Sequence, residues 1–286
     1  MRWLRLVTAV VTCAVLVGVG AAPAAARDRG EDAPYLALGD SVAFGFNPLL
    51  DPHNAANFVG YPEVVAARLD LRLVNASCPG EASGGFISLT SPLDNGCRLY
   101  RAAFPLHVKY TTSQLDFAVA FLLQHPDTRL VTLDIGANDL FVLQKQCNNE
   151  PTCISNGLPG LLGTLGANLG TIYGRLRGEA HYRHRLVGLT YYALDFSNPA
   201  GVAVIQAINA TVARATLAAH GRVANGFDAF EDIARFAGGN SCLAGLLIVT
   251  SRQPLTCDIH PSLLGRNALA SAILQALHGI DLDGVD

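Results

Sequence analysis

The sequence predicts an α/β fold in which helices cover both faces of a parallel sheet. Five apolar runs of strand length recur along the chain, and segments with helical spacing separate them. Parallel strands need a crossover between them, and such crossovers are right-handed in nearly all proteins. The sequence holds no repeat, low-complexity tract or interdomain linker. We therefore expect residues 27–286 to form a single domain.

The elements follow each other in a regular order. We expect strands at the apolar runs 34–38, 71–76, 129–135, 185–191 and 222–227. We expect helices at 61–69, 113–124, 158–177, 202–220 and 261–277. Pro261 is expected at the first helical position of the last segment, where proline is favoured.

Two connections are longer than a compact α/β unit needs. Residues 77–112 are rich in Gly, Ser and Pro, and residues 141–157 follow the third strand; each segment holds two cysteines. Long loops without secondary structure are usually functional or disordered, and a disulfide in each would favour order. We expect them to form walls or lids over a site, with plain surface loops as the alternative.

The first 26 residues have the pattern of a secretory signal peptide. Arg2 and Arg5 precede an apolar run at 6–20, which ends in small residues up to Ala26. A retained membrane anchor is the alternative, but the strongly apolar part is short for a span of about 20 residues. We expect cleavage after Ala26, secretion, and no stable membrane insertion of the mature chain.

The charge of the chain argues against a nucleic-acid partner. The chain has 20 Lys and Arg against 23 Asp and Glu, and the signal segment removes two of the cations and none of the acids. Lys109 and Lys145 are the only lysines, and the sequence shows no basic cluster. A nucleic-acid-binding protein needs a basic surface to neutralise phosphates, so nucleic acid is not an expected partner.

Six cysteines remain after Cys13 in the signal segment is set aside. An even number behind a secretory signal indicates disulfides, although six cysteines allow many pairings. We favour pairing of neighbours, because each pair then falls within one expected loop. A zinc site is the alternative, but none of the spacings is Cys-x-x-Cys, and we expect no metal. The favoured pairs are Cys78 with Cys97, Cys147 with Cys153, and Cys242 with Cys257.

A serine stands directly after the first expected strand, in Gly39-Asp40-Ser41. Gly39 allows a sharp turn, so the next side chains stand at the carboxyl end of the strand, where open α/β sheets bind ligands. Acyl transfer needs a hydroxyl nucleophile, a base, a group that orients the base, and donors for the oxyanion. Ser41 is our candidate nucleophile, and its backbone N–H would lie at a helix N-terminus that favours negative charge.

Three later segments also combine the end of a strand with a polar or glycine-containing turn. In chain order, the four segments resemble the sequence blocks of the GDSL, or SGNH, family of serine esterases and lipases. They are Gly39-Asp40-Ser41, Asn75 to Gly80, Gly136-Ala137-Asn138-Asp139, and Asp258-Ile259-His260-Pro261.

This resemblance implies a flavodoxin-like three-layer α/β/α sandwich with a mostly parallel five-stranded sheet, and catalysis without a cofactor. It also implies a role for each matching residue. Ser41 would be the nucleophile and His260 the base. The Ser41 amide, the Gly80 amide and the side-chain amide of Asn138 would form the oxyanion hole, and a side-chain NH₂ is chemically suited to that task.

The last block departs from the family pattern. The family has an acid three residues before the histidine, whereas here Cys257 stands at that position and the acid, Asp258, is only two residues before His260. Residues two apart in an extended segment project to the same side, so the Asp258 carboxylate is expected to reach the ring. The alternative is a dyad of Ser41 and His260, in which a backbone carbonyl orients the ring.

The sequence indicates a secreted serine esterase or lipase, expected to be a monomer, with a lipid or other small-molecule ester as substrate. Apolar loop residues could contact an acyl chain or could belong to the core. One alternative is a carbohydrate acetylesterase of the same family; another is a non-catalytic relative that binds lipid or glycan. The loop residues are Phe86, Ile87, Leu89, Phe141, Val142 and Leu143.

Overall fold

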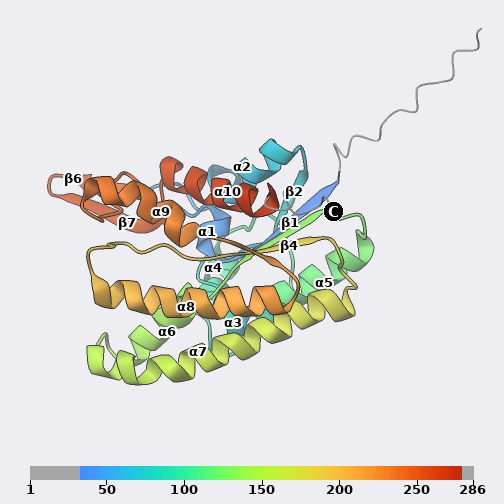
Figure 1. Cartoon of the computed structure of the whole chain (residues 1–286). Coiled ribbons are helices and arrows are strands. Elements are labelled where there is room, and N and C mark those ends of the chain that lie inside the picture. Colours follow the sequence, from blue (N-terminus) through green and yellow to red (C-terminus); the bar gives the residue numbers. More distant parts are fainter. Residues whose placement is uncertain (1–32, 279–286) are drawn as a thin grey trace, which may run out of the picture.

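The computed structural model describes residues 33–278, and the expected signal peptide lies outside this range. Five parallel strands form one sheet in the order β2-β1-β3-β4-β5, the flavodoxin-like order (Figure 1). The predicted fold class is confirmed, and four of the five expected strands lie within about two residues of their predicted bounds, whereas β5 ends three residues early because Gly226 and Phe227 belong to the following helix. They are β1 (Pro34–Gly39), β2 (Arg72–Asn75), β3 (Leu130–Asp134), β4 (Arg185–Leu189) and β5 (Arg222–Ala224).

Alternation along β1 divides the interior into two cores. Tyr35 and Ala37 pack on one face of the sheet, and Leu36 and Leu38 pack on the other. All four side chains are fully buried, because helices cover both faces. A central strand buried on both faces is a continuous apolar run, which is why the sequence revealed it.

The helices form two layers, which lie above and below the sheet in Figure 1. The first core packs against α2 (Tyr61–Leu69), α9 (Gly226–Ala234) and α10 (Leu263–His278). The second core packs against α3 (Ser83–Ile87), α5 (Gln114–Gln124), α7 (Pro151–Gly174), the π-helical turn η2 (Arg175–Glu179) and α8 (Pro199–Ala218). By length and composition α8 alone among the described helices could also cross a membrane, but here it lies against α7, β4 and β5.

Short helices begin at the carboxyl ends of the strands or lie in the connections. They are α1 (Ser41–Phe44) after β1, α6 (Ala137–Gln146) after β3, α4 (Cys97–Ala103), and the 3₁₀ turns η1 (Ala55–Asn57) and η3 (Arg235–Ala237). The expectation that 77–112 and 141–157 lack secondary structure was wrong, because α3 and α4 lie in the first segment and the second belongs to α6 and α7. The helix expected at 158–177 begins earlier because the Glu150 side chain accepts hydrogen bonds from the first-turn amides of Thr152 and Cys153.

An antiparallel hairpin, which the sequence did not predict, carries the last motif. It consists of β6 (Leu247–Arg252) and β7 (Leu255–Pro261). Pro261 is the final residue of β7, so its expected place in the first helical turn was wrong. Instead, the Ser262 hydroxyl accepts hydrogen bonds from the amides of Leu264 and Gly265, and α10 begins at Leu263.

Three disulfides join the neighbouring cysteines of the chain. Cys78 pairs with Cys97, Cys147 with Cys153, and Cys242 with Cys257. The first fixes the segment after β2, and the second joins the end of α6 to the start of α7. The third ties the β6–β7 hairpin to the segment after η3. Each disulfide therefore restrains a connection at the carboxyl end of the sheet.

Candidate active site

A tight turn at the end of β1 places Ser41. Gly39 has φ +140°, and a Cβ at this position would lie 2.1 Å from Oδ1 of Asp134, so no other residue fits. Asp40 follows as the N-cap of α1, and its Oδ1 accepts a hydrogen bond from the Val42 amide at 2.9 Å. The Ser41 hydroxyl therefore stands on the first helical residue at the carboxyl edge of the sheet.

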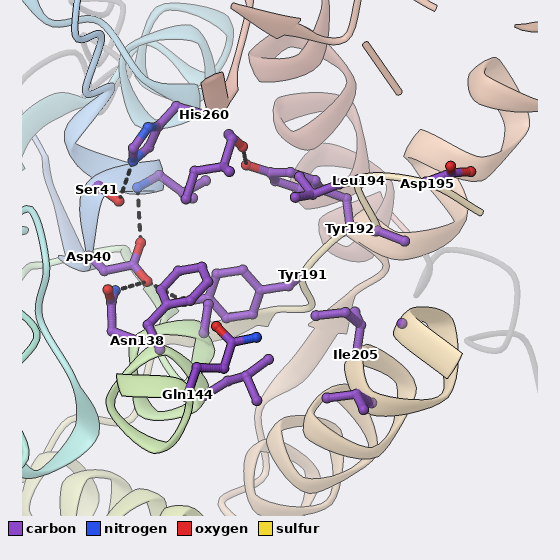
Figure 2. A pocket seen from close by; sticks show the side chains of 18 of the residues that line it. Asp40, Ser41, Asn138, Gln144, Tyr191, Tyr192, Leu194, Asp195, Ile205 and His260 are labelled. Atoms are coloured by element: carbon purple, nitrogen blue, oxygen red, sulfur yellow. Dashed lines mark hydrogen bonds between the residues drawn. The ribbon is translucent and has the colours of Figure 1, made fainter. Parts of the chain in front are cut away.

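His260 lies against Ser41 although 219 residues separate them in the chain. The Nε2 atom of His260 is 2.9 Å from the Ser41 Oγ (Figure 2). On the other side of the ring, Nδ1 contacts Oδ1 of Asp258, which also accepts a hydrogen bond from the His260 amide at 3.0 Å. The carboxylate, rather than a backbone carbonyl, therefore contacts the ring, and alternation along β7 places the two side chains on the same side of the strand.

The Asp258 carboxylate is suited to remain charged. Partial burial raises the pKa of Asp258, but the hydrogen bonds and charge of His260 outweigh this and lower the pKa below its usual range. The Phe46 ring meets the His260 ring edge to face, with centroids 4.9 Å apart. The ring of His260 is thus held by an acid on one side and by an aromatic side chain on another.

Asn138 lies in the first turn of α6, directly beside Asp40. Its Nδ2 donates a hydrogen bond to Oδ2 of Asp40 at 3.0 Å, and its Oδ1 accepts one from Nδ2 of Asn95 at 2.7 Å. The Asn138 side chain is buried, and it lines the same cleft as Ser41. Because a side-chain amide carries two N–H groups, one N–H of Asn138 remains after the bond to Asp40.

Gly80 follows β2 in a left-handed conformation, with φ +81°. A Cβ here would lie 3.1 Å from the backbone of Asn95, Gly96 and Cys97, which explains why glycine occupies the position. Within residues 33–278, neither the Gly80 amide nor the Ser41 amide donates to a protein acceptor. Gly80 does not line the cleft that holds Ser41, although Asn95 connects it to Asn138.

Two buried acids lie below the turn, at Asp40 and Asp134. The hydroxyl of Tyr191 donates to Oδ2 of Asp40 at 2.6 Å, and the hydroxyl of Tyr61 donates to Oδ1 of Asp134 at 3.1 Å. Burial raises the pKa of Asp40, although hydrogen bonds from Tyr191 and Val42 oppose the shift. Burial and the neighbouring Asp40 raise the pKa of Asp134 well above its usual range. Burial therefore acts against charge on both carboxyl groups, and more strongly at Asp134, where the neighbouring Asp40 adds to the effect.

A cleft of about 300 Å³ opens beside Ser41 and His260. Its walls come from α1, α6, the start of α7, the segment after β4, the start of α8, and β7 (Figure 2). Most of its lining is apolar, and a few polar side chains, including Gln144, Asp195 and Asn198, lie among the apolar ones. The apolar lining residues are Val42, Ala137, Leu140, Phe141, Ile154, Tyr191, Tyr192, Ala193, Leu194, Val204, Ile205 and Ile259.

The six loop residues proposed from sequence for acyl contact mostly lie elsewhere. Of these, only Phe141 lines the cleft. Phe86 is fully buried in the second core, and Leu143 packs on Gly157. The sequence analysis missed Tyr191, which follows β4 and combines a cleft contact with the bond to Asp40.

In the described part of the chain, one group of residues has the types and distances of metal ligands: Cys78, Glu81 and Cys97. The two cysteine sulfurs are bonded to each other there, so neither is available as a thiolate ligand.

The family model of the GDSL-like lipase/acylhydrolase family matches residues 37–267, which include all four motifs. The chain belongs to this family.

Solved structures agree with a GDSL fold. An extracellular lipase from Streptomyces rimosus superposes with a TM-score of 0.56 and 20% identity, covering 85% of this chain and 99% of that one. A phospholipase A1 from Streptomyces albidoflavus has a TM-score of 0.57 and 16% identity, and the match covers 85% of this chain and 99% of that one. An acetylxylan esterase from Geobacillus stearothermophilus has a TM-score of 0.52 and 16% identity, and the match covers 86% of this chain and 94% of that one. At these identities the likeness shows the fold alone, and no curated protein matches the sequence.

Proposed function

We propose that this GDSL-family chain hydrolyses carboxylic esters, with Ser41 as nucleophile. The observation that supports this is the 2.9 Å contact between Ser41 Oγ and His260 Nε2, with the Asp258 carboxylate on the opposite ring nitrogen. A serine, a base and an acid in this order form the constellation of acyl-transfer enzymes. The shifted position of Asp258 was the one feature that favoured a non-catalytic relative, whereas its contact with His260 supports a catalytic role.

The proposed reaction has two halves. Ser41 Oγ attacks the carbonyl carbon while His260 Nε2 takes the hydroxyl proton, and Asp258 stabilises the resulting imidazolium. The oxygen of the tetrahedral intermediate receives hydrogen bonds from Asn138 Nδ2 and from the amides of Ser41 and Gly80. His260 then gives its proton to the leaving alcohol, and the acyl group remains on Ser41. A water molecule, activated by His260, attacks the acyl carbon and releases the acid and the free serine.

The cleft supports a fatty-acyl ester as the substrate. Each methylene of an acyl chain that moves from water into the cleft stabilises the bound state, by about 0.8 kcal/mol when the methylene is fully buried. The side chains of Leu140, Phe141, Ile205 and Ile259 offer such a surface along the cleft that holds Ser41. The alternative substrate, an acetylated carbohydrate, would leave most of this apolar wall without a contact.

We also propose that the protein is secreted and acts as a monomer without a cofactor. Three disulfides support an oxidising compartment, because such bonds are rare where thiols are kept reduced. The basic, apolar and small-residue segments at 1–26 support cleavage of a signal peptide after Ala26.

Labelling with a fluorophosphonate tests the nucleophile directly. We expect one adduct on the peptide that contains Ser41, loss of labelling in Ser41→Ala, and a fall in kcat of about 10⁶-fold, since the oxyanion hole and the binding cleft remain. Ser91→Ala is the matched control, because Ser91 lies in the connection between α3 and α4, and it should label as wild type. An adduct on another serine, or full activity in Ser41→Ala, would overturn the proposed function.

A further inference from the structure

Asn95 connects two segments that the proposed function assigns to the oxyanion hole. Its backbone amide donates a hydrogen bond to the Gly80 carbonyl at 3.1 Å. Its side-chain Nδ2 donates to Oδ1 of Asn138 at 2.7 Å, and its Oδ1 accepts a hydrogen bond from Nζ of Lys145 at 2.6 Å. Asn95 is half-buried and lies two residues before Cys97, whose disulfide to Cys78 fixes this segment.

The bond from Asn95 determines which way the Asn138 amide faces. The Asn138 oxygen has Asn95 as its donor, and the Asn138 NH₂ has the Asp40 carboxylate as its acceptor. If the amide turned over, its oxygen would face the Asp40 carboxylate and its NH₂ would face the NH₂ of Asn95. Both contacts would be repulsive, so the two neighbours together select one orientation.

The selected orientation is the one that acyl transfer needs. One N–H of Asn138 is used by Asp40, and the second remains for a developing oxyanion. Lys145 places a positive charge on the far side of Asn95, which polarises the Asn95 amide toward Asn138. Because an oxyanion hole acts only when its donors are aimed in advance, a loosely held Asn138 would contribute less.

We propose that Asn95 is a positioning residue for catalysis and that its side chain holds the Asn138 amide in the donating orientation. This inference rests on the proposed function, because it assumes that Asn138 stabilises an oxyanion. Asn95 itself does not contact the reacting atoms and acts through Asn138. Its effect should therefore appear in the turnover number rather than in substrate binding, since the oxyanion forms only after binding.

The test is a double-mutant cycle with esterase kinetics. Asn138→Ala should lower kcat by about 10²- to 10³-fold. Asn95→Ala should lower kcat by about tenfold and leave KM within about twofold, because the donor remains but is less well held. In the Asn138→Ala background, Asn95→Ala should change kcat by less than about twofold, because no amide remains to be oriented. Asn57→Ala, in the exposed turn η1, is the control and should match wild type.

The melting temperature and a second variant, Asn95→Asp, distinguish positioning of Asn138 from a general structural role. If Asn95→Ala lowers the melting temperature strongly, the isosteric Asn95→Asp replaces it, and the same loss of kcat and the same dependence on Asn138 are expected. Equal losses from Asn95→Ala in both backgrounds would indicate a general structural role and would overturn the inference. Wild-type kcat in Asn95→Ala, with activity still lost in Ser41→Ala, would overturn the inference alone and leave the proposed function in place.

Discussion

The Asp258 carboxylate contacts Nδ1 of His260, and only one residue separates the two in β7. Extended backbone places both side chains on the same side of the strand, and the same carboxylate oxygen accepts the His260 amide hydrogen bond. The spacing differs from the family pattern, but the acid still lies where a histidine-orienting group is needed. The strand geometry therefore compensates for the shifted position of the acid.

The first prediction concerns this acid. Asp258→Asn keeps the size of the side chain but presents an NH₂ to Nδ1, which favours the wrong tautomer of His260. We expect kcat to fall by about 10³- to 10⁴-fold with KM nearly unchanged, and His260→Ala to cost more. Steady-state kinetics with a chromogenic ester measures both.

Asp127→Asn provides the matched control, because Asp127 is exposed in the connection before β3. This variant should retain wild-type kcat. A loss of less than about tenfold in Asp258→Asn would show that the carboxylate does not orient the ring, and a backbone carbonyl would become the better candidate.

The second prediction concerns the cleft. Ile205 on α8 lines its wall, and Ile205→Trp should shorten the space available to an acyl chain. We expect kcat/KM for a decanoyl ester to fall about tenfold or more, while kcat/KM for an acetyl ester stays within about twofold. The measurement is a series of nitrophenyl esters from acetyl to decanoyl.

Leu217→Trp controls for the bulk of the new ring, because Leu217 lies on the same helix with 61% of its surface exposed. Its acyl-length profile should match wild type. A uniform loss across the series in Ile205→Trp would indicate a disturbed serine rather than a shortened cleft. A wild-type preference for acetyl over every longer ester would instead favour the carbohydrate acetylesterase.

The third prediction concerns the disulfide between Cys242 and Cys257, which ties the hairpin that carries His260. Replacing both residues by alanine opens a loop with a sequence separation of 15 and should lower the free energy of unfolding by about 3 kcal/mol. Because the hairpin can then loosen alone, activity should disappear on heating before the secondary structure melts. Activity and circular dichroism across a temperature series measure the two.

The Cys147–Cys153 pair closes a loop of only six and serves for comparison. Its double alanine variant should lose about 2 kcal/mol, and its activity should follow the global transition. If the Cys242–Cys257 variant also lost activity and structure together, the hairpin would be held by its packing rather than by the disulfide.

The sequence predicted the sheet and five long helices because burial on a regular element leaves a periodic pattern. It missed α1, α3 and α4, which are too short to show a period, and the β6–β7 hairpin, whose side chains are mostly exposed or half-buried. It also missed α6, most of which was assigned to a loop, and α9, whose first residues were assigned to the fifth strand. It also placed the start of α7 too late, since glycines and Pro159 conceal the helical pattern there.

Within the site, short motifs at strand ends identified the residues that the structure brings together at Ser41 and His260. The cleft was harder to predict, because its apolar walls come from six separate parts of the chain. An apolar residue has the same sequence signal whether it faces a cleft or a core. Phe86 is an example of the second case. The sequence does contain a signal for Asp134, because an acid within an apolar strand is unusual and indicates a specific buried role. By contrast, nothing in the sequence near Asn95 indicates its hydrogen bonds to Asn138 and Lys145.

The last prediction concerns pH and the buried Glu81. Burial and the nearby Asp94 raise the pKa of Glu81 to about 8, although a hydrogen bond from Gln114 opposes the shift. The folded protein therefore holds a proton that the unfolded chain releases near pH 4.5. Because the folded state binds more protons over this interval, the free energy of unfolding should fall as the pH rises from about 4.5 to about 8.

The variant Glu81→Gln keeps a side-chain oxygen that accepts the hydrogen bond from Gln114, and it removes the titrating group. We expect this variant to match wild type near pH 5 and to exceed its stability by about 2–4 kcal/mol at pH 8. Urea unfolding at several pH values measures the difference, with the exposed Glu231→Gln as the control that should follow wild type at every pH. A constant difference between Glu81→Gln and wild type across the series would show that Glu81 does not hold its proton in the fold.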